Sequence, residues 1–243
     1  MTNLWFVGTF HQDLRGGGRL ERALNYIKPD IVLTEDFGAA VNTPTKEINY
    51  QTRGLIEGTG GYVGNVLTRK DVAEMARLFR NAQKSFRFEA RVLEKYQTET
   101  GLPVVNIDDE TITKGIRNNA TYEGSVTRLT NAILETKTRD RFQEEVDKVY
   151  GLIKKSTSER SPISREELGD TQECGFGPRD IAMAAKLKSF VEKNPGKRIA
   201  FVAGGLHFSF DPDAPSVYAQ TTDLCPNVFV LSDADSLNGS EAI

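Results

Sequence analysis

The sequence predicts one α/β domain over residues 1–243, with a mainly parallel central sheet flanked by helices. Short apolar runs rich in β-branched and aromatic residues are typical of buried strands, and helical stretches separate most of them. With 38% hydrophobic residues, the chain can bury one sizeable core. The five predicted strands are Leu4–Val7, Ile31–Leu33, Val104–Ile107, Ile199–Ala203 and Val228–Leu231.

The first helix is predicted between the first two strands, over residues 19–27. Its apolar residues recur at helical spacing, and Pro29-Asp30 then breaks the pattern. Two strands joined in this way form a βαβ unit, whose strands run parallel. We expect Gly16-Gly17-Gly18, just before this helix, to form a flexible loop, because the phosphate-loop pattern is missing.

Two long helices and a shorter one are expected further along the chain. Apolar stripes predict helices over Arg69–Thr98 and Gly124–Lys154, packed as an antiparallel pair or capping the edge of the sheet. Pro178 suits the first turn of the third helix, which Asn194-Pro195-Gly196 ends before the fourth strand.

Polar composition predicts less regular structure in three places. The segments Val41–Gly64 and Ser156–Gly177 are expected to be mobile loops, either of which could serve as a lid. The small, polar tail over residues 232–243 is expected to be flexible. The basic residues Arg15, Arg19 and Arg22 are interpreted as a solvated face.

Composition argues against several function classes. A net charge of -3 and a pI near 5.6 give no general attraction to phosphate backbones, so we expect no nucleic-acid partner. No apolar stretch approaches the roughly 18 residues of a membrane span, so we expect no membrane partner and a cytoplasmic location. Cys174 and Cys225 are too few for a disulfide framework and lack metal-ligand spacing.

The two histidines of the chain follow predicted strands within one repeated pattern, G-x-x-H. The two motifs are Gly8-Thr9-Phe10-His11 and Gly204-Gly205-Leu206-His207. A glycine at the end of a strand allows the backbone to turn sharply and brings the next side chains over the edge of the sheet. Ligands of parallel sheets bind at the carboxyl ends of the strands, so this pair is the main candidate for a functional site.

Carboxylates follow the other predicted strands and reach the same edge. Glu35 and Asp36 close the second strand, Asp108 and Asp109 follow the third, and Asp233 follows the fifth. Imidazole and carboxylate together suit a divalent metal ion such as Zn, Mn, Co or Fe. They suit equally well the activation of water by a general base without a metal, so both versions stay open.

At these residues the chain resembles the TraB/GumN/TIKI superfamily, whose distant relatives include erythromycin esterases and ChaN-like haem-binding proteins. The resemblance rests on the segments LWFVGTFHQ, KPDIVLTED and GLPVVNIDDETITKGIR and on the second G-x-x-H motif. It implies an α/β fold and cleavage of a peptide or ester bond in a small-molecule or peptide substrate, in some members with a divalent metal. A homo-oligomer is also compatible with it.

Residue by residue, the resemblance places the site at His11, Glu35 and His207, which serve as metal ligands or as base and orienting group. It adds Asp108 and Arg117, and also Arg179 with Asp180 and Met183 at the family's spacing. The chain departs from the family's pattern at three places. Phe37 stands where an Asp is common, with Asp36 as a substitute; Asp109 stands where the family has Arg; and Pro178 stands where the family has Glu.

The leading hypothesis is a hydrolase that is expected to be metal-dependent and to cleave a peptide, ester or similar bond, with His11, Glu35, His207 and Arg179 as catalytic residues. Asp36, Asp108 and Arg117 are expected to bind substrate, and His11, His207 and Glu35 are expected to hold a metal, if one is bound. The alternative is a non-catalytic module that sequesters a peptide, a signalling molecule or a haem or metal ligand. A third hypothesis is an enzyme acting on a phosphorylated substrate held by Arg117 and Arg179.

Overall fold

Five parallel strands form the central sheet. The computed structural model describes residues 3–35, 73, 77–78, 88–109, 111–112, 138–163, 177–210 and 215–237. The strands are β1 (Asn3–Thr9), β2 (Ile31–Thr34), β3 (Val104–Asn106), β4 (Arg198–Gly204) and β5 (Asn227–Val230). They lie in the order β3-β2-β4-β1-β5, and every neighbouring pair is parallel. The predicted α/β class and all five predicted strands are confirmed.

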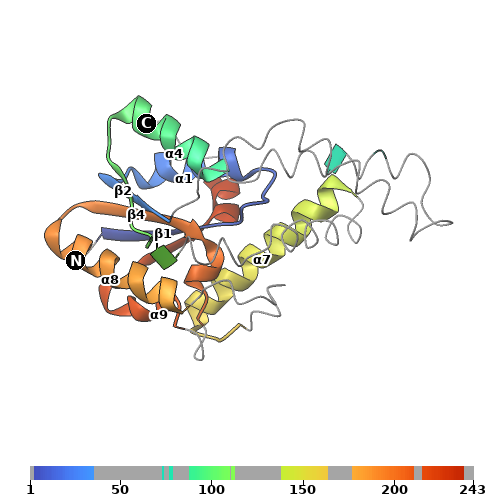
Figure 1. The fold of residues 1–243 in the computed structure, drawn as a ribbon. Helices are drawn as coiled ribbons and strands as arrows, with labels where there is room; N and C mark the ends of the chain where they lie inside the picture. The colour runs from blue at the N-terminus through green and yellow to red at the C-terminus, as the bar shows by residue number, and fades with distance from the viewer. Residues whose placement is uncertain are drawn as a thin grey trace.

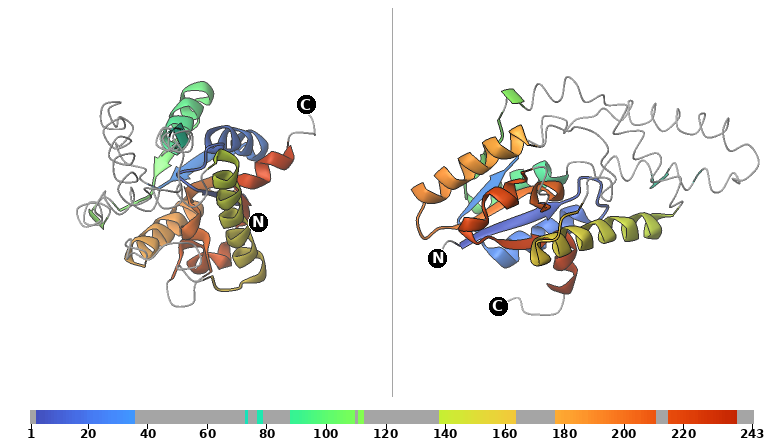
Figure 2. Two further views of the ribbon diagram at one scale, coloured as in Figure 1. Left: turned by 90° about the vertical axis from the view of Figure 1, so that its right-hand side faces the viewer. Right: turned by 90° about the horizontal axis from the view of Figure 1, so that it is seen from below.

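Helices cover both faces of the sheet. Helices α1 (Gly16–Ile27) and α4 (Phe88–Thr100) pack together on one face, and α8 (Pro178–Lys193) and α9 (Val217–Gln220) lie on the other (Figure 1). Helix α7 (Arg139–Glu159) packs on β5 and on the short 3₁₀ helix η2 (Gly205–Phe208). Figure 2 shows these layers from two further directions. Among the described residues, no helix is both long enough and apolar enough to cross a membrane.

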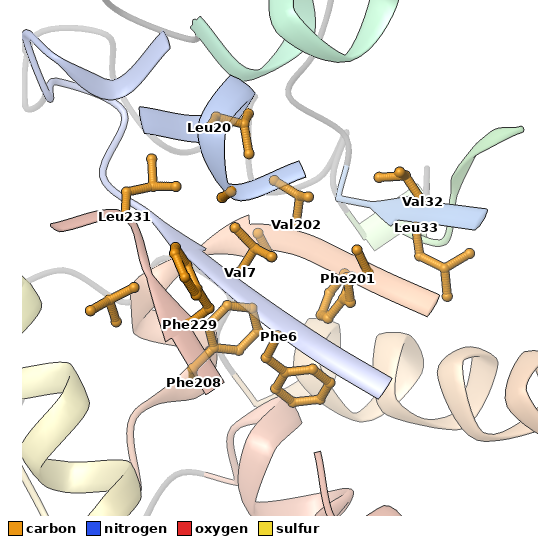
Figure 3. Close-up of a cluster of buried hydrophobic side chains, with 14 of the residues drawn as sticks. Phe6, Val7, Leu20, Val32, Leu33, Phe201, Val202, Phe208, Phe229 and Leu231 are labelled. Carbon is orange, nitrogen blue, oxygen red and sulfur yellow. The ribbon is translucent and has the colours of Figure 1, made fainter. Parts of the chain in front are cut away.

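The hydrophobic core lies on both sides of the sheet. Neighbouring residues of a strand point to opposite faces, so Phe6 and Phe201 lie on the α8 side while Val7 and Val202 lie on the α1 side (Figure 3). Phe6 stacks on Phe208 of η2 with ring centroids 4.9 Å apart. Burial on both faces is the reason why these strands read as continuous apolar runs in the sequence.

The order of the strands brings the ends of β1, β2 and β4 together. The chain leaves β2 toward β3, at one edge of the sheet, whereas it leaves the neighbouring strand β4 toward β5, at the other edge. Such a reversal of direction opens a place for a ligand at the carboxyl ends of the two strands. Thr9, the last residue of β1, pairs with Gly204, the last residue of β4. The residues that follow these strands therefore emerge side by side.

Helix α1 begins earlier than predicted. Gly16 to Gly18 form its first turn, so the prediction of a flexible loop is wrong. The reason is packing against α4, because Gly16 is buried on Phe88 so closely that a Cβ atom at Gly16 would overlap the aromatic ring.

The predicted helix Gly124–Lys154 is not continuous. Helix α7 begins at Arg139, because Thr138 has an extended backbone and its side-chain oxygen accepts a hydrogen bond from Arg141 N, as an N-cap residue does. The helix then continues to Glu159 and buries Ser156 and Thr157, so the start of the predicted loop Ser156–Gly177 is helical.

The remaining long-helix and loop predictions have different outcomes. The helix predicted to begin at Pro178 is confirmed as α8. Of the predicted helix Arg69–Thr98, the structure describes mainly the part that belongs to α4, and the segment Val41–Gly64 lies outside the described residues. The predicted antiparallel pairing of the two long helices also falls largely outside the described residues.

The tail is ordered as far as Leu237, contrary to the prediction of a flexible end. Residues Leu231–Leu237 form the 3₁₀ helix η4, which packs on α1 and buries Ala234. The carboxylate of Asp235 binds Arg19, whose side chain is completely buried. The prediction that Arg19 belongs to a solvated basic face is therefore wrong, while residues 238–243 lie outside the described part of the chain.

Candidate functional site

Glu35 is the centre of a buried charged cluster at the carboxyl edge of the sheet. It follows β2, and its side chain is 3% exposed. Its Oε1 accepts a hydrogen bond of 2.7 Å from Gly204 N and lies 3.9 Å from His11 Nε2. Its Oε2 lies 2.9 Å from Arg179 Nη2 and 3.0 Å from His207 Nε2. One carboxylate therefore joins the residues that follow β1 and β4 to the start of α8.

The two histidines are held in the same manner. His207 Nδ1 lies 2.6 Å from Asp180 Oδ1, and His11 Nδ1 lies 2.8 Å from Glu89 Oε1. In each ring Nδ1 is fixed by a buried carboxylate while Nε2 is directed at Glu35. A carboxylate on one ring nitrogen sets the tautomer and orientation of an imidazole. The rings differ in access to solvent, because the His11 side chain is 37% exposed and that of His207 is 4% exposed.

Arg179, in the first turn of α8, is locked between two carboxylates. Its Nε lies 3.1 Å from both Asp108 oxygens, and its Nη2 lies 2.5 Å from Asp108 Oδ2 and 2.9 Å from Glu35 Oε2. Lys186, further along α8, donates a 2.6 Å hydrogen bond to the carbonyl oxygen of Asp108. Asp108 thus holds Arg179 in this arrangement, and its binding of substrate stays a prediction.

Charge pairing dominates the protonation of this cluster. Burial alone would raise the pKa of Glu35, but the positive charges of His207 and Arg179 outweigh burial and hold it far below its usual value. Burial alone would lower the pKa of His207, but Asp180 and Glu35 raise it to about 9. The pKa of Arg179 is also raised, because attraction to Glu35 and Asp108 exceeds the effect of burial. At neutral pH, Arg179 and a His207 imidazolium therefore face an ionised Glu35.

The first glycine of each G-x-x-H motif is needed for close packing of neighbouring side chains. The expectation that these glycines allow a sharp backbone turn is not confirmed. The backbone of Gly204 has φ -53°, and Gly8 is not among the described glycines with positive φ. A Cβ atom on Gly8 would lie 3.2 Å from the Phe208 ring. A Cβ atom on Gly204 would lie 3.3 Å from Glu35 Oε1 and 3.6 Å from His11 Nε2. The second glycine thus leaves the space between these two site residues open.

Five of the predicted site residues lie together in the structure, and two buried carboxylates join them that the sequence pattern does not predict as site residues. His11, Glu35, Asp108, Arg179 and His207 all meet in this cluster, whereas Asp36 and Arg117 lie outside the described residues. The first is Glu89, which is completely buried here, and a carboxylate inside the apolar stripe of a predicted helix is unusual. The second is Asp180, which the sequence marks only by its spacing, and its carboxylate lies 2.6 Å from His207 Nδ1.

The arrangement fits a divalent metal ion poorly. His11, His207 and Glu35 are donors that Zn, Mn, Co or Fe accept. However, Arg179 places its guanidinium 2.9 Å from Glu35 Oε2 and 3.4 Å from His207 Nε2, the atoms that would have to face the metal. In the part of the chain that the structure describes, no group of three or more His, Cys, Asp or Glu side chains could hold a metal ion. Metal binding at these residues stays a prediction.

No protein-family model, curated protein or solved structure matches this chain. The likeness to the TraB/GumN/TIKI superfamily rests on the motifs of the sequence and stays a prediction. The geometry around Glu35 is thus the ground on which a function can be assigned.

Proposed function

We propose that this protein is a hydrolase that cleaves a peptide, ester or similar bond, with His11 as the general base. The observation that carries the proposal is the position of His11, whose Nδ1 binds the buried carboxylate of Glu89 while its Nε2 faces Glu35 at a partly exposed position. A histidine fixed in this way donates a hydrogen bond from Nδ1–H to the carboxylate and keeps Nε2 as the basic atom. It can therefore take a proton from a water molecule that enters from solvent.

The reaction then follows the ordinary course of acyl hydrolysis. His11 Nε2 takes one proton from water while the water oxygen forms a bond to the carbonyl carbon of the substrate, and the π electrons of the carbonyl move to its oxygen. When the tetrahedral species collapses, the bond to the leaving group breaks. The leaving group takes its proton from His11, and the imidazole returns to its neutral form.

Arg179 supplies the positive charge that the tetrahedral oxyanion needs. Its guanidinium is held on Asp108 and Glu35, so little reorganisation is required when charge develops nearby. Glu35 fixes Arg179 and His207 in place, and it accepts the backbone hydrogen bond of Gly204 that orders the end of β4.

The test is hydrolysis of a panel of p-nitrophenyl esters and short peptides by the wild type and by His11→Asn. The amide nitrogen of an Asn takes the place of imidazole Nδ1, so the contact with Glu89 is kept while the basic Nε2 is lost. We expect kcat to fall at least 100-fold, as for other general bases, with an unchanged circular dichroism spectrum. The matched surface control is Glu21→Gln, an exposed carboxylate paired with Lys95, which should keep full activity.

A variant His11→Asn that retains wild-type kcat would contradict this role for His11. A wild type that binds a peptide or ester without any turnover would support the non-catalytic binding module instead.

The metal content of the purified protein and the effect of a chelator on activity test whether a metal ion takes part. We expect purified protein without stoichiometric metal and with activity that survives chelation. Activity lost on chelation and restored by Zn, Mn, Co or Fe would replace the metal-free reaction by one in which His11, His207 and Glu35 hold the ion.

A further inference from the structure

A second buried polar cluster lies next to the His11 turn, which comprises residues 10–13. We call it the Asp13 cluster, and its members are Asp13, Arg19, Gln143 and Tyr150. Asp13, Arg19 and Tyr150 have side chains with no measurable exposure, and Gln143 is 3% exposed. A carboxylate and a guanidinium are costly to bury unless they are fully paired, so a cluster of this kind needs a reason.

Asp13 binds three side chains and one backbone group. Its Oδ2 lies 3.0 Å from Arg19 Nη1 and accepts a 3.1 Å hydrogen bond from the Tyr150 hydroxyl. Its Oδ1 accepts hydrogen bonds of 3.0 Å from Gln143 Nε2 and 2.8 Å from Arg15 N. The side chain that follows the His11 turn is thereby tied to α1 and α7 at once.

Tyr150 ties down the other side of the same turn. Its hydroxyl accepts a 2.9 Å hydrogen bond from Phe10 N, the amide next to His11, while it donates to Asp13. The turn itself closes with a 2.8 Å hydrogen bond from Asp13 N to Phe10 O. His11 is partly exposed in this turn, as are Phe10 and Gln12, and the residues that anchor it on both sides meet at the buried hydroxyl of Tyr150.

We propose that Tyr150 and Asp13 are positioning residues that fix the His11 imidazole for its role as general base. The inference rests on the proposed function, and it assigns Tyr150 no contact with substrate. If Glu89 on α4 were the only anchor of this partly exposed turn, the imidazole ring could shift along the edge of the sheet. Misplacement of a reacting group by about 1 Å can cost roughly 100-fold in rate, so a rigid anchor behind the turn has a direct catalytic value.

The experiment compares Tyr150→Phe with Tyr218→Phe. Tyr218 is the matched control, because its hydroxyl also makes a buried hydrogen bond to α7, of 3.1 Å to the carbonyl oxygen of Thr157. Among the described residues, this hydroxyl makes no hydrogen bond to the His11 turn. The chain has two histidines, so their imidazole NMR signals can be assigned with His11→Asn alone. We expect Tyr150→Phe to shift the His11 signals and leave those of His207 in place, and to lower kcat by about 10- to 100-fold with little change in KM. Tyr218→Phe should change none of these.

The inference is wrong if Tyr150→Phe leaves the His11 signals and kcat like those of Tyr218→Phe. Should Tyr150→Phe fail to fold, Asp13→Asn decides in its place, because it keeps the shape of Asp13 and should shift the same His11 signals. The NMR readout needs no substrate, so it separates the two proposals. Absence of hydrolysis with His11 signals that respond to Tyr150 contradicts the hydrolase alone. Hydrolysis that needs His11 but is indifferent to Tyr150 contradicts the positioning role alone.

Discussion

A single added methyl group at Gly204 tests the candidate site. An added methyl group would lie 3.3 Å from Glu35 Oε1 and 3.6 Å from His11 Nε2, in the space where water must stand for the proposed reaction. Because φ of Gly204 is -53°, alanine fits the backbone without strain. We expect Gly204→Ala to lower kcat/KM roughly 100-fold while the free energy of unfolding changes by about 1 kcal/mol or less. Ester or peptide hydrolysis and urea unfolding measure the two effects.

The control for this substitution is Gly151→Ala. Gly151 lies in helix α7, and a Cβ atom there has nothing within 4 Å. Activity should be unchanged, and stability should rise by up to ~1 kcal/mol because alanine favours the helix. A fully active Gly204→Ala would show that the space between His11 and Glu35 is not used.

His207 predicts a pH dependence of stability. Its pKa is raised from 6.5 to about 9 in the folded protein by Asp180 and Glu35, which outweigh burial. A group with a raised folded pKa contributes stability that is complete below its unfolded pKa and is lost as the pH rises through the folded pKa. The free energy of unfolding should therefore fall between pH 6.5 and 9, by at most a few kcal/mol, since each pKa unit is worth roughly 1.4 kcal/mol.

Urea unfolding of the wild type and His207→Gln from pH 6 to pH 10 measures this contribution. Groups other than His207 titrate in both proteins, so the difference between the two curves isolates it. The free energy of unfolding of the wild type should exceed that of His207→Gln at pH 6, and this difference should shrink as the pH rises. Parallel curves would mean that His207 is not held as an imidazolium in the folded protein.

Residues at strand ends could be predicted from the sequence because a repeated motif marks them. His11 and His207 share G-x-x-H, and Glu35 directly follows an apolar run, so a parallel sheet was enough to bring the three together. Glu89 and Asp180 reach the site from helices, where no local spacing links them to a histidine. Their roles depend on how α4 and α8 pack, which periodicity does not specify.

At the scale of elements, the start of α1 depends on its contact with α4. Gly16 lies against Phe88, so Gly16→Ala must push the ring or the helix aside, and we expect a loss of about 1–3 kcal/mol in the free energy of unfolding. At the next position, a Cβ atom on Gly17 would make an ordinary contact of 3.8 Å with Val92. Gly17→Ala should therefore be neutral or stabilising by up to ~1 kcal/mol. Urea unfolding of both variants checks the contrast, and equal effects would contradict the close packing of α1 on α4.

The elements were predictable to different degrees for a physical reason. Strands β1 and β4 are buried on both faces, so their apolar runs stand out in the sequence. The start of α1 is set by a contact with Phe88, and the start of α7 by the side chain of Thr138. Glycine has a low helix propensity, so the sequence pattern places Gly16 outside the helix. The apolar stripe instead runs on through Thr138, because periodicity carries no information on which side chain caps a helix.

At the scale of the whole molecule, Arg19 joins parts of the chain that are far apart in sequence. It extends from α1 to Asp13 after β1, to Asp147 on α7 and to Asp235 in η4. The sequence pattern predicts a solvated arginine, because the residues that bury Arg19 come from distant parts of the chain. Residues 231–237 are ordered for the same reason, since a buried guanidinium needs the Asp235 carboxylate.

Replacement of Arg19 should therefore weaken the whole fold. Arg19→Met keeps an apolar stem but leaves the buried Asp13 without its cation and removes the ion pairs of Arg19 with Asp147 and Asp235, so we expect a loss of about 3–5 kcal/mol in the free energy of unfolding. The control is Arg22→Met, one turn along α1, which removes a partly exposed pair with Asp235 and should cost at most about 1 kcal/mol. Urea unfolding measures both, with hydrogen exchange at the amides of η4 as a local readout. Faster exchange there in Arg19→Met than in Arg22→Met is expected, and equal stabilities of the two variants would mean that Arg19 does not tie these segments together.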